Sequence, residues 1–339
     1  MNNILCSIII PYYNVPDELV NKCITSVINQ DWRETCYEVI FINDGSIIPI
    51  AESTKQLFSK IRLFTLIEQE NQGLSAARNS GIKASNGKYI FFIDPDDYWF
   101  QFSIGKLLPI LNNDFYDIIK FRSQHIFEYD NKKKQTEKTC NTYTYSSGCE
   151  YLSKHNIIKG ACTYCYLRNF IISHNLFMPV GIIHEDEWFL TKVFFYANNI
   201  LDANITLYAY IKRDGSITSI KSCQQWNKSL THFYESIKLS LDIKNNIAKS
   251  KSEISAINNR LSYILCDYIY NIFNSSLPKK DKIYHLQALE YVNLLPLPPL
   301  GNNKKYNLIR LFSSNYTTLN IATKCLRFIN NLRNNNRDY

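Results

Sequence analysis

The chain has 339 residues, of which 45% are hydrophobic and 20% are charged, and its formal net charge is +8. This size and apolar content suit one large α/β domain with an appendage, or two domains. There is no low-complexity segment or internal repeat, and no run of about 18 uninterrupted apolar residues, so the sequence predicts no transmembrane helix.

The amino-terminal segment MNNILCSIIIPYYN has neither a basic region nor a small-residue cleavage site. Its apolar run is therefore interpreted as a strand rather than a signal peptide, and we expect a cytoplasmic protein. The ten cysteines are expected to be scattered, partly buried thiols. Cys162 and Cys165 form a C-x-x-C pair, but a structural zinc site would need a second pair of ligands, which the sequence lacks.

The first hundred residues alternate strands and helices. Apolar strands are predicted at 5–11, 37–42, 62–67 and 89–93, with helices at 17–30, 51–60 and 73–85 between them. Continuous apolar strands separated by helices favour a parallel sheet covered on both faces. Ligands bind beyond the carboxyl ends of such strands. Polar clusters follow all four strands, at 12–14, 43–46, 70–73 and 94–97, so we expect them to converge on one edge.

The pattern changes after residue 97. The sequence predicts, in order, a helix at 104–111, a strand at 117–122, an exposed hairpin or loop at 123–145, a short aromatic strand at 163–167, a helix from His184 to Tyr196 and a strand at 205–211. From about residue 224 onward it predicts mostly helix. A proline-rich stretch at 295–299 interrupts this region.

The tail from residue 301 to residue 339 is basic, with seven Lys or Arg residues against one acid, so it carries +6 of the net charge of +8. Leu, Ile and Phe residues are interleaved with the cations. Such a tail can rest on an anionic membrane face. Alternatively, it is a solvated terminal helix with one side docked on the protein.

Asp94 and Asp96 flank Pro95 at the end of the fourth predicted strand. Carboxylate oxygens at this spacing suit Mg²⁺ or Mn²⁺, which commonly bridge a protein to substrate phosphates. The alternative is an Asx-type turn that caps the following helix. Because the pair lies on the same predicted edge as three other polar clusters, we favour the metal. Asp97 either orients its neighbours or caps the next helix.

Two further side chains at this edge could contact a ligand. Asp44 can accept a hydrogen bond from a base N–H or a ribose hydroxyl, or it caps a helix, a role that Ser46 could also fill. Arg78 lies in the second turn of its predicted helix and offers a fork to phosphate or to a base carbonyl. The alternative for Arg78 is a surface residue on an ordinary packing helix.

A second acidic pair, Glu185-Asp186, opens a predicted helix about 90 residues after the first acids. The helix dipole favours acids at this position without any functional role. In a cleft, however, a carboxylate can act as the general base that deprotonates an alcohol. Asp186 is the preferred candidate, ahead of His184.

Together the motifs resemble the nucleotide-diphospho-sugar glycosyltransferases of family 2, which have the GT-A fold. The matching stretches are SIIIPYYN at 7–14, VIFINDGS at 39–46, NQGLSAARN at 71–79, YIFFIDPDD at 89–97, EDEWF at 185–189 and RDGSIT at 213–218. The resemblance covers about residues 4–220. It implies a GT-A domain over 1–220, with a mixed sheet flanked by helices, and a mainly helical region over 221–339.

The resemblance also implies roles for individual residues. The nucleotide pocket would be lined by Pro11, Tyr12 and Asn14. Asp44 would hold the base, typically uracil, and Arg78 would approach the base or the phosphates. Asp94 would lie near the ribose and diphosphate, Asp96 would ligate Mn²⁺ or Mg²⁺, and Asp186 would be the catalytic base, while Arg213 and Ser216 would close over the diphosphate.

The implied activity is the inverting transfer of one sugar from a UDP-sugar to a growing bacterial surface glycan, carried on a lipid. The processive synthases of the family carry transmembrane helices and a Gln-x-x-Arg-Trp motif, which are missing here, so one sugar per visit is expected. The alternatives are a catalytically inactive sugar-nucleotide-binding or scaffold protein, against which Asp96 and Asp186 argue, and a nucleotidyltransferase. A nucleotidyltransferase would show a Gly-rich signature and a Lys near the amino terminus, and the segment IIIPY at 8–12 has neither. No nucleic-acid partner is expected.

Overall fold

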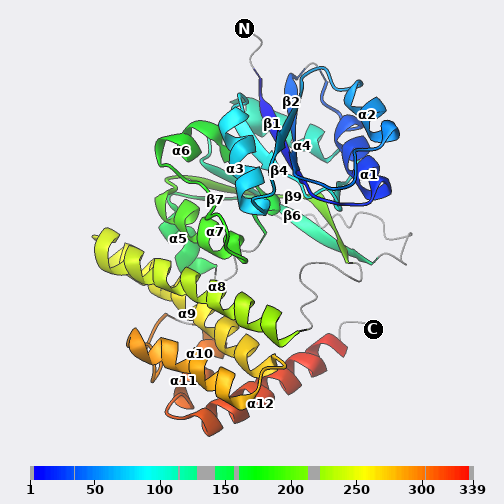
Figure 1. Cartoon of the computed structure of the whole chain (residues 1–339). Helices are drawn as coiled ribbons and strands as arrows, with labels where there is room; N and C mark the ends of the chain where they lie inside the picture. The colour runs from blue at the N-terminus through cyan, green and yellow to red at the C-terminus, as the bar shows by residue number, and fades with distance from the viewer. Residues whose placement is uncertain are drawn as a thin grey trace. The chain divides into compact units, whose positions relative to one another are not determined.

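The computed structural model describes residues 4–33, 35–113, 115–127, 142–155, 160–212, 222–301 and 303–335, with side chains described as far as residue 325. The chain divides into two compact units (Figure 1). The first comprises Met1–Gly148 and Lys159–Ser216, and the second comprises Cys149–Ile158 and Ile217–Tyr339. The sequence pattern did not predict that residues 149–158 belong to the second unit.

Four parallel strands form one half of the sheet in the first unit, in the order β3-β2-β1-β4. They are β1 (Cys6–Tyr12), β2 (Tyr37–Asp44), β3 (Phe64–Gln69) and β4 (Tyr89–Phe92). Every residue of β1 and β4 is buried, as expected of central strands covered on both faces. The parallel arrangement predicted from the apolar runs is therefore confirmed.

The sheet continues beyond β4 in the order β8-β6-β9-β5, and β7 pairs with β9. These strands are β5 (Tyr98–Trp99), β6 (Ile118–Phe127), β7 (Tyr143–Tyr145), β8 (Tyr164–Leu167) and β9 (Ile200–Lys212). β8 runs antiparallel to both β4 and β6, whereas β6 runs parallel to β9. The sheet is thus mixed, as the family resemblance implied.

Part of the stretch predicted as an exposed hairpin or loop, 123–145, is strand. β6 extends through Phe127 because its ladder with β9 continues from Ser123 to Phe127. Its polar side chains Ser123 and His125 alternate with less exposed ones, as on a half-buried strand. This alternation is too short to predict a strand without knowledge of the pairing with β9. Residues 128–141 lie outside the described part of the chain.

Helices flank the sheet of the first unit (Figure 1). They are α1 (Asp17–Ile28), α2 (Glu52–Phe58), α3 (Leu74–Ala84), α4 (Ser103–Asn113), α6 (Arg168–Ser173) and α7 (Glu185–Tyr196). α1 buries Val20, Cys23, Ile24 and Val27, which share one face at helical spacing. α3 approaches β1 closely at Gly81, where a Cβ atom would lie 2.4 Å from Cγ2 of Ile9.

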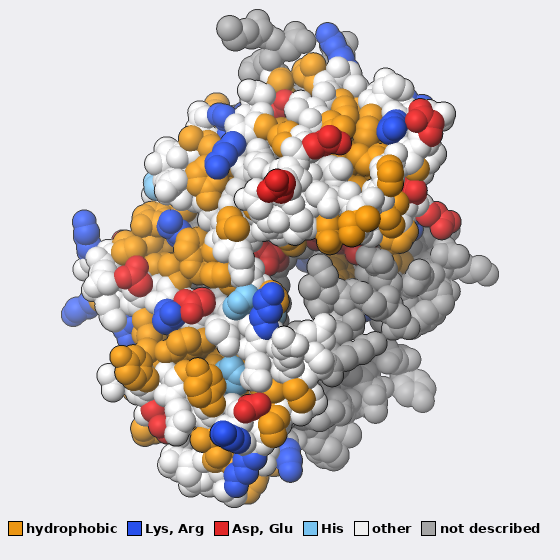
Figure 2. Space-filling model, in the orientation of Figure 1, with side chains coloured by type: hydrophobic (Ala, Val, Ile, Leu, Met, Phe, Trp, Pro, Cys, Tyr) orange, Lys and Arg blue, Asp and Glu red, His pale blue; other side chains and the backbone are white. Residues whose placement is uncertain are grey.

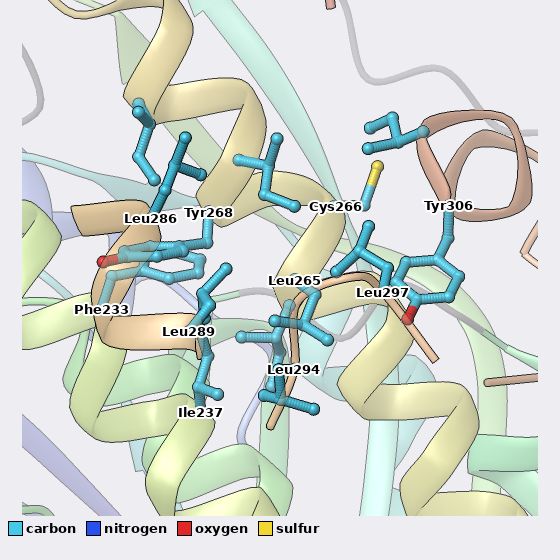
Figure 3. Close-up of a cluster of buried hydrophobic side chains, with 14 of the residues drawn as sticks. Phe233, Ile237, Leu265, Cys266, Tyr268, Leu286, Leu289, Leu294, Leu297 and Tyr306 are labelled. Carbon is cyan, nitrogen blue, oxygen red and sulfur yellow. The ribbon is translucent and has the colours of Figure 1, made fainter. Parts of the chain in front are cut away.

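The second unit is helical, which confirms the prediction for the region after residue 224. Apart from α5 (Gly148–Lys154), its helices are α8 (Cys223–Asp242), α9 (Lys251–Asn274), α10 (Lys279–Tyr291), α11 (Lys304–Leu311) and α12 (Tyr316–Asn335). Ser222 and Ser250 begin α8 and α9 with capping boxes. A core that includes Phe233, Leu265 and Leu289 joins the helices (Figure 3).

The basic tail packs against this core through buried residues of α11 and α12. Tyr306 and Ile309 of α11 and Leu319 of α12 are buried in the same apolar cluster, and the Tyr306 hydroxyl donates to the Pro298 carbonyl at 2.7 Å (Figure 3). Lys304 and Lys324 remain exposed. Among the described residues, no helix is long and apolar enough to cross a membrane.

Candidate active site

A hydrogen bond between Asn14 and Ser46 connects the turns that follow β1 and β2. Asn14 has a positive φ of 49°. Its backbone N–H donates to Oγ of Ser46 at 3.0 Å, and its side-chain Oδ1 accepts from the N–H of Ile47 at 3.0 Å. Of the three residues predicted to line a nucleotide pocket here, Pro11 and Tyr12 are buried within β1, and Asn14 is half-buried. The accessible part of this predicted pocket is therefore the turn at Asn14.

Asp44 ends β2 and holds the loop that leads into α3. Its Oδ1 accepts from Nε2 of Gln69 at 2.8 Å and from the N–H of Gln72 at 3.0 Å, and its Oδ2 accepts from the N–H of Gly73 at 2.8 Å. An ionised carboxylate offers about four acceptor positions, so one remains on Oδ2. Glycine at position 45 allows the loop to come close to β2, because a Cβ atom there would lie only 2.6 Å from the Asn71 nitrogen. Its φ of +69° also favours glycine.

The three acids after β4 have different environments. Asp94 and Asp96 are partly exposed, whereas Asp97 is buried. The Asp97 carboxylate accepts from the Tyr208 hydroxyl at 2.6 Å and from the N–H of Ile211 at 2.8 Å, both in β9. Since α4 begins at Ser103, Asp97 does not cap that helix. The orienting role is the one of its two predicted alternatives that the contacts support.

Burial and the charge of Asp94 raise the pKa of Asp97 to about 8, against the opposing effect of its hydrogen bonds from Tyr208 and Ile211. The mutual repulsion of the acids is thus reduced in two ways. The carboxyl group of Asp97 is directed into the protein toward β9, and that of Asp94 is paired with the guanidinium of Arg78.

Arg78 of α3 connects the two acidic groups. Its side chain is 2% exposed, and its Nη2 lies 2.7 Å from Oδ1 of Asp94. Its Nη1 lies 3.0 Å from Oε1 of Glu185 and 3.4 Å from Oδ1 of Asp186. The interpretation of Arg78 as a surface residue on a packing helix is therefore wrong. The guanidinium is directed to three carboxylates rather than outward to solvent.

Asp186 and Glu185 open α7 next to this guanidinium. The second carboxylate oxygen of Asp186 accepts from the N–H of Ala161 at 3.3 Å. Burial raises the pKa of Asp186, against the lowering effect of Arg78. Burial and the charge of Asp186 raise the pKa of Glu185 to about 7, again against Arg78. The side chain of Asp186 is still 30% exposed, so a ligand can reach it.

His184, the alternative base, precedes α7 in a left-handed conformation with φ at 68° and makes no side-chain cap. The structure thus brings Arg78, Asp94 and Asp186 together. Arg213 and Ser216, predicted from the same resemblance, lie outside the described residues.

Asp96 is the predicted metal ligand. In the described part of the chain, no group of three or more His, Cys, Asp or Glu side chains is arranged to hold a metal ion. Asp94 and Asp96 nevertheless offer hard carboxylate oxygens on one turn. This donor set fits a cation that takes its remaining ligands from substrate phosphates and water, as Mg²⁺ and Mn²⁺ commonly do.

Tyr208 and Ala161 were not predicted as site residues, and Cys162 was considered only for its C-x-x-C spacing. Tyr208 donates to Asp97, and Sγ of Cys162 accepts from Nη2 of Arg78 at 3.6 Å. No local signal predicts these contacts, because each residue lies at least 25 positions from its partner in the sequence. Burial raises the pKa of both the Cys162 and the Cys165 thiols, and five of the nine cysteines in the described part of the chain are buried.

Comparison with known proteins matches the chain to a family, to individual relatives and to solved structures. The sequence pattern of "Glycosyl transferase family 2" matches residues 7–181. The uncharacterized glycosyltransferase YibD of Escherichia coli K12 is 28% identical over 243 residues, which cover 69% of this chain and 68% of YibD. A poly(ribitol-phosphate) beta-glucosyltransferase of Bacillus spizizenii is 26% identical over 234 residues, covering 63% of this chain but only 33% of that protein.

A solved structure shares the fold over most of its length. It is S. aureus TarS 1-349 in complex with UDP-GlcNAc, which superposes with a TM-score of 0.75 at 16% identity and covers 96% of this chain and 92% of the other. The family pattern covers more than half of the present chain and includes Asn14, Asp44, Arg78 and Asp94. The chain therefore belongs to glycosyltransferase family 2.

Proposed function

We propose that this glycosyltransferase is inverting and transfers one sugar from a UDP-sugar to a sugar hydroxyl of a growing surface glycan. The observation that carries the proposal is the shared guanidinium of Arg78, which lies within 3.4 Å of both the donor-side carboxylate of Asp94 and the accessible carboxylate of Asp186. This places a donor contact and a general base on the same small region of the site, as is needed to bring the reacting atoms of the two substrates together.

The donor nucleotide is assigned to the carboxyl edge of the parallel strands. Asp44 is only 2% exposed, and its Oδ2 accepts from the N–H of Gly73, so the N–H of a uracil base is proposed to approach the remaining acceptor position on this oxygen. The turn at Asn14 lies beside the end of β2 and provides the adjoining wall. TarS was solved with UDP-GlcNAc, which supports a uridine nucleotide for this chain as well. Arg213 and Ser216 are proposed to close over the diphosphate on the strength of their motif.

Asp94 and Asp96 are proposed to face the ribose and the diphosphate. Asp96 would ligate Mn²⁺ or Mg²⁺, and Asp94, already paired with Arg78, would contact the ribose. When bound, the cation neutralises the negative charge that accumulates on the departing diphosphate. The chain itself contributes a fixed turn, because the N–H of Asp97 donates to the Asp94 carbonyl at 3.0 Å.

Asp186 is proposed as the general base. In its ionised form it accepts the proton of the acceptor hydroxyl while that oxygen forms a bond to the anomeric carbon of the donor. The bond from this carbon to the diphosphate oxygen breaks on the opposite face, and its electron pair leaves with the nucleoside diphosphate, so the configuration inverts. Arg78 and the N–H of Ala161 hold the carboxylate during this step.

The acceptor is proposed to be lipid-linked, and the protein cytoplasmic with peripheral contact to the membrane through residues 301–339. Lys304 and Lys324 are exposed on this segment, together with Ile321 at 54% and Leu311 at 71%. On the face drawn in Figure 2, Lys and Arg side chains lie among hydrophobic ones over the helices of the second unit, with some Asp and Glu side chains between them. A mixed basic and apolar surface suits anionic lipid headgroups.

A panel of nucleotide sugars tests the proposed activity. The protein is incubated with Mn²⁺ and each donor, with and without an oligosaccharide acceptor mixture, and the released nucleoside diphosphate is measured. We expect one or a few UDP-sugars to release UDP, and Asp186→Asn to abolish the release. Nucleotide binding without turnover for any donor would instead favour the inactive sugar-nucleotide-binding or scaffold protein. Pyrophosphate release from UTP and a sugar phosphate would favour the nucleotidyltransferase.

A further inference from the structure

A chain of hydrogen bonds joins β9 to the turn that carries Asp94. The Tyr208 hydroxyl donates to Oδ2 of Asp97 at 2.6 Å and accepts from the backbone N–H of Asp94 at 3.2 Å. The other oxygen of Asp97 accepts from the N–H of Ile211 at 2.8 Å. One hydroxyl therefore connects a buried carboxylate with the peptide group of a residue assigned to the donor site.

We propose that Tyr208 and Asp97 are positioning residues that set the donor-contacting geometry of Asp94. The inference rests on the proposed function, since Asp94 is assigned to the donor there. It adds Tyr208, which neither the motifs nor the comparisons assign to the reaction, and it gives the orienting role expected of Asp97 a specific partner. Tyr208 acts through the backbone of Asp94, and Asp97 acts through the hydroxyl of Tyr208.

The position of these groups supports a rigid connection. Tyr208 and Asp97 are each 2% exposed, so their hydrogen bonds form away from competing water. The Asp94 carbonyl is also held, by the N–H of Asp97 at 3.0 Å and the thiol of Cys23 at 3.6 Å. Both the N–H and the C=O of Asp94 are therefore fixed before any donor arrives. Preorganisation of this kind increases affinity because less conformational freedom is lost on binding.

The same turn controls the position of the proposed base. Asp94 is the nearest ion-pair partner of Arg78, at 2.7 Å, and Arg78 contacts Asp186 at 3.4 Å. A displacement of the Asp94 backbone would therefore move the guanidinium relative to the base. Since an error of about 1 Å in a reacting geometry can cost about a hundredfold in rate, the effect on turnover need not be small.

The test compares Tyr208→Phe with a matched control, Tyr268→Phe. Tyr268 is a buried tyrosine of the second unit whose hydroxyl lies 3.3 Å from Nδ1 of His285. Each variant loses one buried hydroxyl, so both are expected to lower the melting temperature to a similar extent. Calorimetry with UDP, GDP and dTDP, in Mn²⁺ and in EDTA, measures affinity for the nucleotide that the wild type binds best.

We expect Tyr208→Phe to raise the dissociation constant about tenfold in both buffers and to raise the donor KM, while Tyr268→Phe leaves both at the wild-type value. Asp97→Ala, which removes both carboxyl oxygens, is expected to match Tyr208→Phe. The double variant is expected to be no weaker than either single one, because all three interrupt the same connection.

Three results would overturn the inference. Wild-type affinity in Tyr208→Phe and Asp97→Ala, with only their stability reduced, would mean that the two residues have a purely structural role. Failure of both variants to fold would lead to the same conclusion. If the wild-type protein binds none of the three nucleotides, the proposed function itself fails, and the positioning role falls with it.

Discussion

The guanidinium of Arg78 lies 2.7 Å from the carboxylate of Asp94, although the two residues belong to different elements, one in α3 and the other at the end of β4. The same guanidinium contacts the two acids at the start of α7. One buried cation therefore compensates three carboxylates. This arrangement joins the turn assigned to the donor with the side chain assigned as base.

The first prediction concerns stability. Arg78→Ala should lower the free energy of unfolding by about 3–5 kcal/mol, because it leaves three partly buried carboxylates without their counter-charge. Arg78→Lys should recover only part of this loss, since an ammonium group lacks the planar fork that serves several acceptors at once. Urea unfolding at neutral pH measures both values. The exposed Arg33, paired with Asp31 at 3.5 Å, provides the control, and Arg33→Ala should change stability by less than about 1 kcal/mol. Equal stability of the Arg78 and Arg33 variants would contradict the prediction.

Asp186→Asn should reduce kcat by at least about a hundredfold, because the amide cannot accept the proton of the acceptor hydroxyl. Nucleotide affinity should remain that of the wild type, since Asp186 is not assigned to the donor. Released nucleoside diphosphate measures the first quantity and calorimetry the second. Asp31→Asn, at an exposed site, is the control for the loss of one negative charge. Unchanged turnover in Asp186→Asn would remove the base assignment.

The third prediction is a pH dependence. A general base must be ionised, and burial raises the pKa of Asp186, while the pKa of its neighbour Glu185 is raised to about 7. Glu185 takes up its proton near pH 7, and Asp186, whose pKa is also raised, is protonated as the pH falls, so kcat/KM should decrease on the acid side. Glu185→Gln removes a negative neighbour and a competitor for Arg78, so the remaining carboxylate should have a lower pKa. The acid limb should then move to lower pH. Profiles recorded from about pH 5 to about pH 9 measure this, and an unshifted limb in the variant would count against the pairing.

Asp96→Ala should weaken UDP binding about tenfold in the presence of Mn²⁺ and should leave binding in EDTA unchanged, because the side chain is assigned to the cation and not to the nucleotide. Calorimetric titrations in the two buffers give the comparison. Wild-type binding that is equally tight with and without the metal would argue against a metal at this turn.

The fifth prediction concerns the basic tail. Deleting it would remove Tyr306, Ile309 and Leu319 from the core of the second unit, so substitution of exposed lysines is the better test. Lys304→Glu combined with Lys324→Glu should reduce binding to vesicles containing anionic phospholipid at least about tenfold, since each lysine near such a surface contributes about 1 kcal/mol.

Lys55→Glu combined with Lys83→Glu, at exposed positions of the first unit, changes the net charge equally and should have a smaller effect. Co-sedimentation with anionic and with zwitterionic vesicles measures the bound fraction. Equal binding by the two double variants would leave the tail as a docked helix without a membrane role.

Much of the fold was predictable because the relevant patterns are local. The Ile-rich run in β1 and the turn residues Asn14, Gly45 and Gly73 specify strands and their ends within a few residues of sequence. The helical spacing of Val20, Cys23 and Ile24 in α1 is equally local. Strand β6 was underestimated because its polar half becomes a strand only through its pairing with β9.

The sequence by itself determined the parallel half of the sheet, the edge where its polar clusters meet, and the family. Only the tertiary structure decided which of these polar groups act on one another. Asp97 pairs with Tyr208 across 111 residues of sequence, and Arg78 reaches Asp186 across 108. Such contacts depend on how β8, β6 and β9 complete the sheet, and no short-range periodicity records that. Burial then sets the strength of each pairing, since a carboxylate removed from water needs a donor or a cation, and the fold determines which one is within reach.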